Sequence, residues 1–423
     1  MTSTAPTLEA EYDAAIRRDE TDTAASRRDR FLLPTGRDGR PKAYLAGQSL
    51  GAQPKAARAA VEERLDAWAR LGVDGWFDRD RPWIDVEREL AGMTARLVGA
   101  LPTEVTTANT LTVDLHLLLA SLFRPDGRRR RILIDAPTFP SDRYAVESQL
   151  RHHGLEPASD LVVVRPRPGE DTVRPDDLDE AIDRHRDDLA VALLAGVNYA
   201  TGQAFDIRRH TAAVHGAGAI AIWDLAHAAG NLPLSLHDDA VDAAAWCTYK
   251  YLNAGPGALA QLFIHERFAD DGATPRLAGW WGNEPGTRFR MAETFDPGPG
   301  ADGFRVSTPP ILSLAPIAVS LAMFDEVGMP ALRERSVALT GELERLIDAY
   351  VPDATVVTPR DPTERGSQLT IRVDDAHARL RALEAFDVVA DVREPDLIRL
   401  APVPMYCSFD DVVRAVDALR QTA

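Results

Sequence analysis

The sequence predicts an α/β protein of the aspartate-aminotransferase type, with a mostly parallel sheet in a large domain and a smaller α+β domain at the C-terminus. Between about 105 and 270, helical stretches alternate with short runs that are apolar on both faces. This pattern is typical of parallel strands covered by helices. Beyond the Pro- and Gly-rich segments 295–303 and 307–312, short strands and helices mix. The predicted units are an N-terminal arm at 1–55, a large domain at 56–305 and a small domain at 306–423.

The elements of the first two units follow in chain order. Residues 1–45 are polar and irregular, so we interpret them as an arm, and 53–71 has the apolar spacing of a helix. Six short apolar runs are expected to be strands of the sheet because they are bounded by turn signals. These runs are 131–137, 160–166, 189–197, 218–224, 243–249 and 258–266.

The C-terminal unit begins with a long helical stretch at about 313–350. A helix at 377–386 has apolar residues at helical spacing, and Ser408 is a suitable N-cap for the last helix. The predicted strands of this unit are 355–359, 368–373, 388–394 and 397–402.

Composition excludes several classes of protein. The chain has 423 residues and a net charge of −17, which argues against nucleic-acid binding. The longest apolar stretch, 189–197, is far shorter than the roughly 20 residues of a membrane span. The N-terminus lacks the apolar core of a signal peptide, and only two cysteines are present. We therefore expect a cytoplasmic protein without disulfides. The ten histidines show no metal-ligand spacing, so no metal is expected.

Lysine is scarce in this sequence. Of 48 basic residues only Lys42, Lys55 and Lys250 are lysines. Arginine cannot replace a lysine that must lose its proton or form a Schiff base. Each remaining lysine is therefore a stronger functional candidate than usual, and Lys250 lies in an aromatic context, Trp-Cys-Thr-Tyr-Lys-Tyr.

Asp224 and Lys250 end two successive predicted strands. Ligands of open α/β sheets bind at the carboxyl ends of strands. An aspartate and a lysine in one such crevice suit pyridoxal phosphate, because the lysine forms a Schiff base and the carboxylate keeps the pyridine nitrogen protonated. The alternatives are a helix N-cap for Asp224 and a solvated loop lysine for Lys250.

At these residues the sequence resembles the kynureninase family, a group of fold-type-I pyridoxal-phosphate enzymes. The segment 224–257, DLAHAAGNLPLSLHDDAVDAAAWCTYKYLNAGPG, carries the resemblance together with FPSD at 139–142. Further family blocks occur in order over nearly the whole chain, at 46–55, 81–84, 109–123, 198–207, 277–282, 303–312, 364–371 and 398–412.

The resemblance implies hydrolysis of L-kynurenine, or of 3-hydroxy-L-kynurenine, to an anthranilate and L-alanine in tryptophan catabolism. It also implies pyridoxal phosphate as the cofactor, a small amino acid as the substrate, and a homodimer in which the neighbouring subunit contributes to each active site. No nucleic-acid or membrane partner is expected.

The resemblance also implies roles for single residues. Leu111, Thr112, Tyr249, Trp280 and Thr308 hold the cofactor phosphate; a hydroxyl and backbone N–H groups at a helix N-terminus suit an anion. Phe139 stacks on the ring, Asp142 forms a hydrogen bond near it, Asp224 pairs with the ring nitrogen and His227 lies beside the cofactor. Pro140 and Ser141 are further cofactor-binding positions. Lys250 is the Schiff-base lysine, and Tyr249 relays a proton. From the residues alone, Thr112 is equally an N-cap, Phe139 a core residue and Asp142 a turn residue.

Substrate contacts are implied for Arg399, Trp76 and Asn283. Arg399 would clamp the α-carboxylate, which suits the fork geometry of guanidinium, and the alternative is a surface cation. Three positions depart from the family pattern: Ala195 replaces a hydroxyl residue, and Trp76 and Asn283 replace histidines. These departures concern the ring substituent of the substrate.

Two other functions remain open at this point. One is another fold-type-I activity, either an aminotransferase or a cysteine-desulfurase-like lyase. A desulfurase needs a loop cysteine, which neither Cys247 nor Cys407 resembles. The other is a non-catalytic pyridoxal-phosphate-binding protein, against which the presence of Lys250, Asp224 and Arg399 argues.

Overall fold

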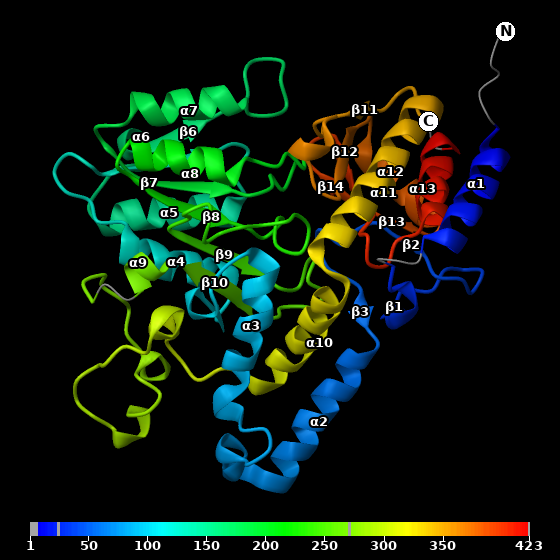
Figure 1. Ribbon diagram of the computed structural model, residues 1–423. Helices are drawn as coiled ribbons and strands as arrows, with labels where there is room; N and C mark the ends of the chain where they lie inside the picture. The colour runs from blue at the N-terminus through cyan, green and yellow to red at the C-terminus, as the bar shows by residue number, and fades with distance from the viewer. Residues whose placement is uncertain (1–6, 23–25, 270–271, 422–423) are drawn as a thin grey trace.

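The computed structural model describes residues 7–22, 26–269 and 272–421. Parts of the predicted arm (1–6 and 23–25) and the last two residues of the predicted small domain lie outside the described residues. Figure 1 shows a large α/β unit in green and cyan beside a smaller unit in orange and red, with helices α2 and α10 below the junction.

A seven-stranded sheet forms the centre of the large unit, in the order β4-β10-β9-β8-β7-β5-β6. All six predicted apolar runs contain a strand of this sheet, which confirms the α/β prediction. The strands are β4 (Val105–Ala108), β5 (Arg131–Asp135), β6 (Leu161–Val164), β7 (Leu189–Ala195), β8 (Ile220–Asp224), β9 (Ala243–Cys247) and β10 (Ala260–Ile264).

The sheet is parallel except at β10, which runs antiparallel to both β9 and β4. Strand β4 was not predicted, because its sequence VTTA is not an apolar run. Its Thr107 is buried in a polar contact: Gln261 Nε2 donates to Thr107 Oγ1 at 3.0 Å and also to Thr94 Oγ1 of α3 (Val86–Val98) at 2.7 Å. A buried polar network of this kind leaves no hydrophobic period in the sequence.

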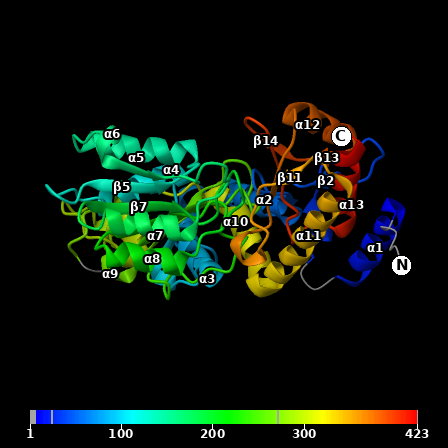
Figure 2. The ribbon, with the colours of Figure 1, turned by 90° about the horizontal axis from the view of Figure 1, so that it is seen from above.

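Helices cover both faces of this sheet (Figure 2). Ile132 and Ile134 of β5 pack with the helices α4 and α5, whereas Leu133 between them packs with α7 and α8. Alternate residues of one strand therefore face two hydrophobic layers. The helices of the large unit are α3 (Val86–Val98), α4 (Leu111–Leu122), α5 (Pro140–His152), α6 (Pro157–Asp160), α7 (Pro175–Arg184), α8 (Ile207–Gly216) and α9 (Glu266–Ala269).

The small unit is built on a four-stranded antiparallel sheet in the order β11-β12-β15-β14. Ser408 caps the last helix as predicted: its hydroxyl accepts from the Asp411 N–H at 3.1 Å, and its own N–H donates to the Asp411 carboxylate at 3.0 Å. The elements are β11 (Thr355–Val356), β12 (Leu369–Arg372), α12 (Ala376–Ala385), β13 (Val388–Val389), β14 (Asp391–Arg393), β15 (Leu397–Leu400) and α13 (Phe409–Gln421).

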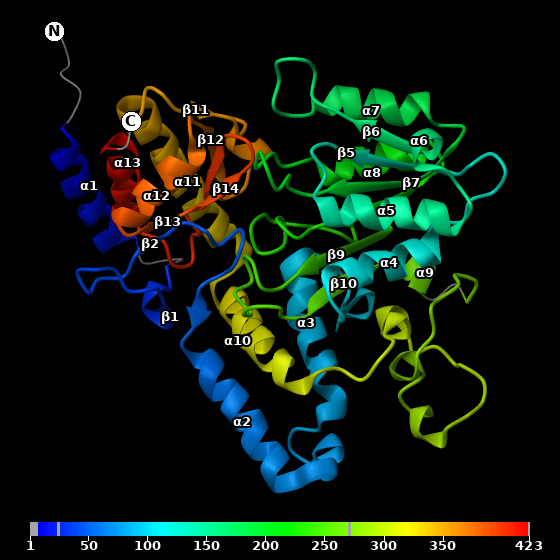
Figure 3. The ribbon, with the colours of Figure 1, turned by 180° about the vertical axis from the view of Figure 1, so that it is seen from behind.

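The prediction of an irregular arm was wrong for α1 (Leu8–Thr21), which packs against α13 (Figure 3). Ion pairs to the helix α11 hold it, among them the Arg345–Glu11 pair at 2.6 Å. Ala15 and Leu45 belong to the core of the small unit. The N-terminal segment also forms the short strands β1 (Phe31–Leu32), β2 (Ala43–Tyr44) and β3 (Gln53–Pro54), followed by the predicted helix α2 (Ala56–Leu71).

The single helical stretch predicted at 313–350 is two helices, α10 (Ile311–Val327) and α11 (Met329–Tyr350). They meet at an angle of 84° at Gly328, whose φ of 80° is left-handed and ends α10. Helix α10 packs against α2 and α3, in the core of the large unit. This packing favours a boundary near Gly328, and the boundaries taken from the sequence stay a prediction. No single helix among residues 7–22, 26–269 and 272–421 has the length and apolarity of a membrane span.

Candidate active site

The site lies at the carboxyl ends of β8 and β9. Asp224 is the last residue of β8, and Lys250 follows three residues after the end of β9 at Cys247. Because β8 and β9 are parallel neighbours, their carboxyl ends meet at one edge of the sheet. The structure therefore brings these two predicted residues together.

A cavity at this edge collects most of the predicted cofactor residues. Leu111, Thr112, Phe139, Ser141, Asp142, Asp224, His227, Tyr249 and Lys250 all line it. The remaining lining residues are Thr110, Asp135, Pro137, Thr138, Leu193, Ala195, Val197, Asn198 and Tyr199.

Lys250 is buried and points its amine at a histidine. Its Nζ lies 3.1 Å from His227 Nε2. Burial and the charge of Lys250 hold the pKa of His227 well below its usual value, so the imidazole is neutral near pH 7. Its Nδ1 is buried without a hydrogen-bond partner among the described residues. Phe139 and Tyr249 flank the amine, with ring centroids 5.7 and 5.9 Å from Nζ.

Two neighbouring carboxyl groups, those of Asp142 and Asp224, line the cavity. Burial raises the pKa of Asp142 well above its usual range, and the charge of Asp224 and a hydrogen bond between the two carboxyls raise it further. Asp142 Oδ1 has no partner among the described residues. Asp224 is oriented by the Ala226 N–H, which donates to its Oδ1 at 2.8 Å. The pair thus combines an anchored carboxylate with a protonated neighbour.

Asp135 is a cavity residue that the sequence interpretation missed. Burial raises the pKa of Asp135 to about 6. Hydrogen bonds from the Ala195 N–H at 3.0 Å and from Asn198 Nδ2 at 3.3 Å act in the opposite direction and limit this rise. Asp135 ends β5 as Asp224 ends β8, so the strand-end position was the available signal. For Asn198 the available signal was its place in the family block at 198–207.

Two helices point their N-termini toward the cavity. Thr112 lies in the first turn of α4 and Ser141 in the first turn of α5, and their hydroxyls are 2.6 Å apart. Both helices carry free N–H groups and positive dipole ends there. Two hydroxyls and two N-termini form a site that suits a phosphate group.

Residues 46–51 of the N-terminal segment support the backbone at Lys250. The Gly51 N–H donates to the Tyr249 carbonyl at 2.8 Å. A Cβ on Gly51 would lie 2.3 Å from the Lys250 carbonyl oxygen, so only glycine permits this approach. Segment 46–51 therefore belongs to the support of the site.

Arg399 lies in β15 and is fully enclosed by polar partners. Its Nε donates to Asp391 Oδ1 at 2.6 Å, its Nη2 donates to the same carboxylate and to Ser49 Oγ at 2.8 Å, and its Nη1 donates to the Tyr199 carbonyl at 2.7 Å. Tyr199 also lines the cavity. The Nε–Nη2 edge that a bidentate clamp uses is thus occupied by Asp391, and Arg399 itself is not among the residues that line the cavity.

The other predicted residues do not line the cavity. Pro140 is the first residue of α5 and Thr308 is exposed. Trp76 packs edge-on against Trp281, with ring centroids 5.4 Å apart. Trp280 donates its Nε1–H to the Arg288 carbonyl at 3.1 Å, and Asn283 Oδ1 accepts from the Asp296 N–H at 2.7 Å. Within one chain, these side chains are therefore separate from Lys250.

Solved structures share this fold. A cysteine desulfurase from Escherichia coli aligns with a TM-score of 0.75 at 16% identity, over 93% of this chain and 97% of its own. A C-DES mutant with glycine covalently linked to its PLP cofactor aligns with a TM-score of 0.73 at 18% identity, over 90% and 96%. These likenesses confirm the predicted fold of fold-type-I pyridoxal-phosphate enzymes.

Sequence relatives are much closer. A kynureninase from Salinispora tropica is 51% identical over 97% of both chains, and one from Myxococcus xanthus is 48% identical over 95% of both. The family model described as the kynureninase C-terminal domain matches residues 332–419. The chain belongs to the kynureninase family.

Proposed function

We propose that this chain is a pyridoxal-phosphate-dependent hydrolase that cleaves L-kynurenine, or a ring-hydroxylated relative, to an anthranilate and L-alanine. The observation that carries the proposal is the buried pairing of Lys250 Nζ with neutral His227 at the strand ends of a kynureninase-family chain. The net reaction adds water across the bond between the β- and γ-carbons of the substrate.

The cavity fits pyridoxal phosphate in its donor chemistry. Lys250 is the one amine among the described lining residues, and it is the point of covalent attachment. Thr112, Ser141 and the two helix N-termini suit the phosphate. The buried polar atoms Asp142 Oδ1 and His227 Nδ1 have no hydrogen-bond partner among the described residues, so a bound cofactor can supply one.

When bound, pyridoxal phosphate supplies an electron sink for negative charge at the substrate carbon that bears the amine. Asp224, held by the Ala226 N–H, keeps a proton on the ring nitrogen. The Lys250 amine removes and returns protons at the substrate carbons, and His227 accepts a hydrogen bond from it at 3.1 Å. Tyr249 lines the cavity and stays protonated because burial raises its pKa, so its hydroxyl can donate a hydrogen bond to the phosphate and relay a proton.

Arg399 binds the substrate α-carboxylate in this proposal. Its side chain contacts Tyr199, a lining residue, and its charge contributes to keeping His227 neutral. Asp391 holds the Nε–Nη2 edge of the guanidinium, so carboxylate binding uses Nη1 or replaces part of the Asp391 contact. Trp76 and Asn283 contact the aryl ring of the substrate.

The functional unit is a homodimer with shared active sites, located in the cytoplasm. Two segments carry exposed aromatic side chains: Phe77 is 61% exposed, Trp280 44% and Phe289 45%. The segment that carries Trp280, between α9 and α10, extends away from the sheet (Figure 3). An apolar surface of this kind suits a second copy of the chain, which would bring Trp76, Trp280, Asn283 and Thr308 to the neighbouring cavity. Both cysteines are free thiols, as in a reducing compartment.

A cysteine-desulfurase activity is disfavoured by the thiols. Cys247 lies in β9 and Cys407 in the core of the chain, both buried, and burial raises the pKa of each. Neither can reach a substrate as a thiolate.

The test is a product assay with the purified full chain and pyridoxal phosphate. Incubation with L-kynurenine should release anthranilate and L-alanine in a 1:1 ratio, and the Lys250→Arg variant should release neither, because guanidinium forms no Schiff base. Borohydride reduction should place a pyridoxyl group on the peptide that contains Lys250. Release of sulfide from cysteine without anthranilate from kynurenine would reject the proposal.

A further inference from the structure

A second cluster of titratable side chains lies at the opposite edge of the large sheet. Glu104 ends the turn Pro102–Glu104 just before β4, His237 lies in the loop between β8 and β9, and His265 follows β10 directly. Ile264, the residue before His265, pairs with Ala243 at the start of β9, whereas Lys250 follows the end of that strand. The cluster is therefore remote from the active-site edge.

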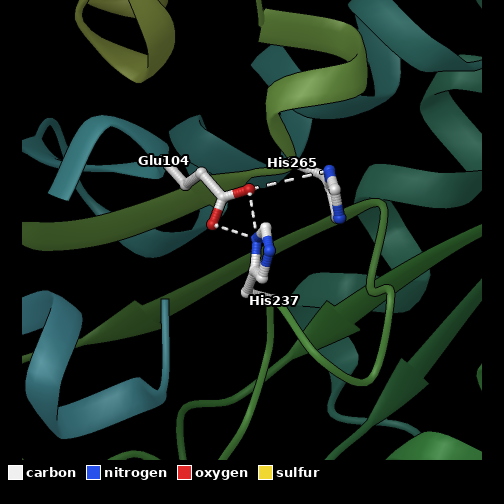
Figure 4. Close-up of side chains that lie close together, drawn as sticks. All are labelled: Glu104, His237 and His265. Atoms are coloured by element: carbon white, nitrogen blue, oxygen red, sulfur yellow. Dashed lines mark hydrogen bonds and ion pairs between the residues drawn. The ribbon is translucent and has the colours of Figure 1, made fainter. Parts of the chain in front are cut away.

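Three donor atoms converge in this cluster (Figure 4). His237 Nδ1 lies 3.0 Å from both carboxylate oxygens of Glu104, and His265 Nδ1 lies 3.6 Å from Oε1. One ligand atom from each residue lies within 4.8 Å of the other two. The two imidazole rings stack with centroids 5.0 Å apart and an angle of 20°. The Nδ1 atoms of His237 and His265 thus both point toward the Glu104 carboxylate.

Two of the three donor separations are close to those of a tetrahedral metal site. Nitrogen and oxygen ligands bind zinc at about 2.0–2.2 Å, so two ligands of a tetrahedron lie about 3.3–3.5 Å apart. The two observed nitrogen–oxygen separations, 3.0 and 3.6 Å, lie on either side of that edge. Small side-chain rotations are enough to close the set around an ion.

The protonation pattern leaves a position for a cation between His265 and Glu104. His265 Nδ1 accepts the Arg267 N–H at 3.3 Å, so this nitrogen carries no proton. An unprotonated nitrogen and a carboxylate oxygen therefore lie 3.6 Å apart, and a metal ion between them takes the nitrogen lone pair in place of the Arg267 N–H.

The carboxylate is rigidly positioned, and the imidazoles are reachable. Glu104 is fully buried, its Oε2 accepts from the Leu101 N–H and its Oε1 from the Glu266 N–H, each at 3.0 Å. The side chains of His237 and His265 remain 30% and 12% exposed. Arg267, the basic residue nearest to His265 in the sequence, donates to the Asp242 carboxylate. A fixed buried anion beside accessible imidazoles is the arrangement that captures an ion from solvent.

We propose that Glu104, His237 and His265 bind a divalent transition-metal ion of the zinc class, with water in the remaining position. The set of two imidazoles and one carboxylate suits zinc and excludes magnesium and calcium, which prefer oxygen ligands. The bound ion ties the start of β4, the end of β10 and the loop before β9 together. It stabilises the base of the segment that leads through α9 toward Trp280.

The test measures metal binding by the full-length holoenzyme after treatment with a chelator. Zinc chloride is titrated calorimetrically into the wild type and into His237→Asn, His265→Asn and His215→Asn. His215 is the matched control, because its Nε2 pairs with the Asp242 carboxylate at 2.8 Å with a similar exposure of 33%, and among the described residues this pair has no third metal-binding side chain. Cobalt(II) in place of zinc reports four-coordinate geometry by its visible absorption.

One equivalent of zinc should bind to the wild type and to His215→Asn. Both ligand variants should lose this equivalent or bind it at least tenfold more weakly, with loss of the cobalt spectrum and of the zinc-induced rise in Tm. Without metal, the turnover of L-kynurenine should be the same in all four proteins. Equal zinc binding by all four, or an equal loss in His215→Asn, would overturn the site. If one histidine variant does not fold, the other decides the result.

Discussion

Nζ of Lys250 and Nε2 of His227 are 3.1 Å apart, and both side chains are buried. His227 comes from the turn after β8 and Lys250 from the turn after β9, so the register of two parallel strands sets this contact. An imidazole with Nε2 as the acceptor carries its proton on Nδ1, which has no partner among the described residues. The contact therefore requires His227 to stay neutral.

His227 should make the cofactor-free protein sensitive to acid. Its pKa is held well below the usual value, so the stability that depends on the neutral imidazole is present above about pH 6.5 and is lost as the pH falls below it. His227→Gln cannot be protonated in this range. The free energy of unfolding of the wild type, measured by urea titration, should therefore drop more steeply from pH 7 to pH 5 than that of the variant.

Other histidines titrate over the same range, and the comparison needs a control. His210 is also buried with a lowered pKa, but it pairs with Asp179 outside the cavity at 2.8 Å. The control introduces His210→Gln into both the wild type and the His227→Gln variant. The difference between their pH profiles of the free energy of unfolding should then stay the same. Parallel pH profiles for wild type and His227→Gln would show that His227 is not the responsible group.

Asp142 should limit the stability of the cofactor-free protein. Its pKa is raised well above the usual range, so folding becomes less favourable as the pH rises through about 4, where the unfolded carboxyl ionises. Asp142→Asn removes this penalty. We expect the variant to be more stable by about 1–3 kcal/mol at pH 8, to match the wild type near pH 4, and to lose at least tenfold in kcat.

Asp135→Asn is the matched control for this prediction. Asp135 is also buried with a raised pKa, but it accepts hydrogen bonds from Ala195 and Asn198. In Asp135→Asn, the NH2 group of the new amide faces one of these two N–H donors, which loses its acceptor. The substitution should therefore destabilise the protein at pH 8. A decrease in stability at pH 8 for Asp142→Asn would contradict the predicted sign.

Arg399→Lys should raise KM for L-kynurenine by roughly one to two orders of magnitude. A charge-assisted contact to the substrate carboxylate contributes about 1.5–3 kcal/mol, and an ammonium cannot serve Asp391, Tyr199 and the substrate together. Binding of a decarboxylated analogue should change much less. Equal losses for both ligands would mean that Arg399 only supports the fold through Asp391.

Lys250→Arg and the double variant Trp280→Ala/Thr308→Val should complement each other if subunits share their sites. Each variant alone should be almost inactive. In a mixture refolded at equal amounts, half of the dimers are hybrids and one of the two sites in each is intact, so about 25% of the wild-type activity should return. Lys250→Arg mixed with Asp224→Asn is the control, because both residues line the cavity of one chain. Recovery in the control mixture, or none in the first, would reject the shared site.

The fold was predictable where residues bury apolar side chains locally. Strands β5 to β10 are apolar on both faces and were found, whereas β4 is held by Gln261 and the helix α1 by ion pairs such as Arg345–Glu11. Both depend on partners more than 150 residues away in the chain. A local hydrophobic pattern cannot report such contacts.

The residues of the site that lie at strand ends could be predicted from the sequence, whereas the contacts that support them could not. Asp391 and Arg399 are directly opposite each other on antiparallel strands, a register that the sequence does not reveal. The same holds for the approach of Gly51 to Lys250. Trp76, Trp280, Asn283 and Thr308 came from the family resemblance alone, and their roles stay predictions.

L-kynurenine should be preferred over its 3-hydroxy form. The family resemblance implies that histidine and asparagine at the positions of Trp76 and Thr308 go with the hydroxylated substrate, and this chain has neither residue there. A ring hydroxyl buried without a partner costs about 1–3 kcal/mol. Trp76 offers one N–H donor and a large apolar face, and it packs against Trp83 and Trp281 with centroids 5.6 and 5.4 Å away. This aromatic surface suits an unsubstituted aminophenyl ring.

Asn283 is the residue that decides the size of this preference. Its Oδ1 already accepts from the Asp296 N–H at 2.7 Å, so its amide can offer the hydroxyl only the Nδ2 donor. The measurement compares kcat/KM for the two substrates in the wild type and in Asn283→His, under one set of conditions. We expect the wild type to favour L-kynurenine and the variant to shift toward the hydroxylated substrate, because imidazole can accept its proton. A tenfold wild-type preference for 3-hydroxykynurenine, about 1.4 kcal/mol, would reject the preference.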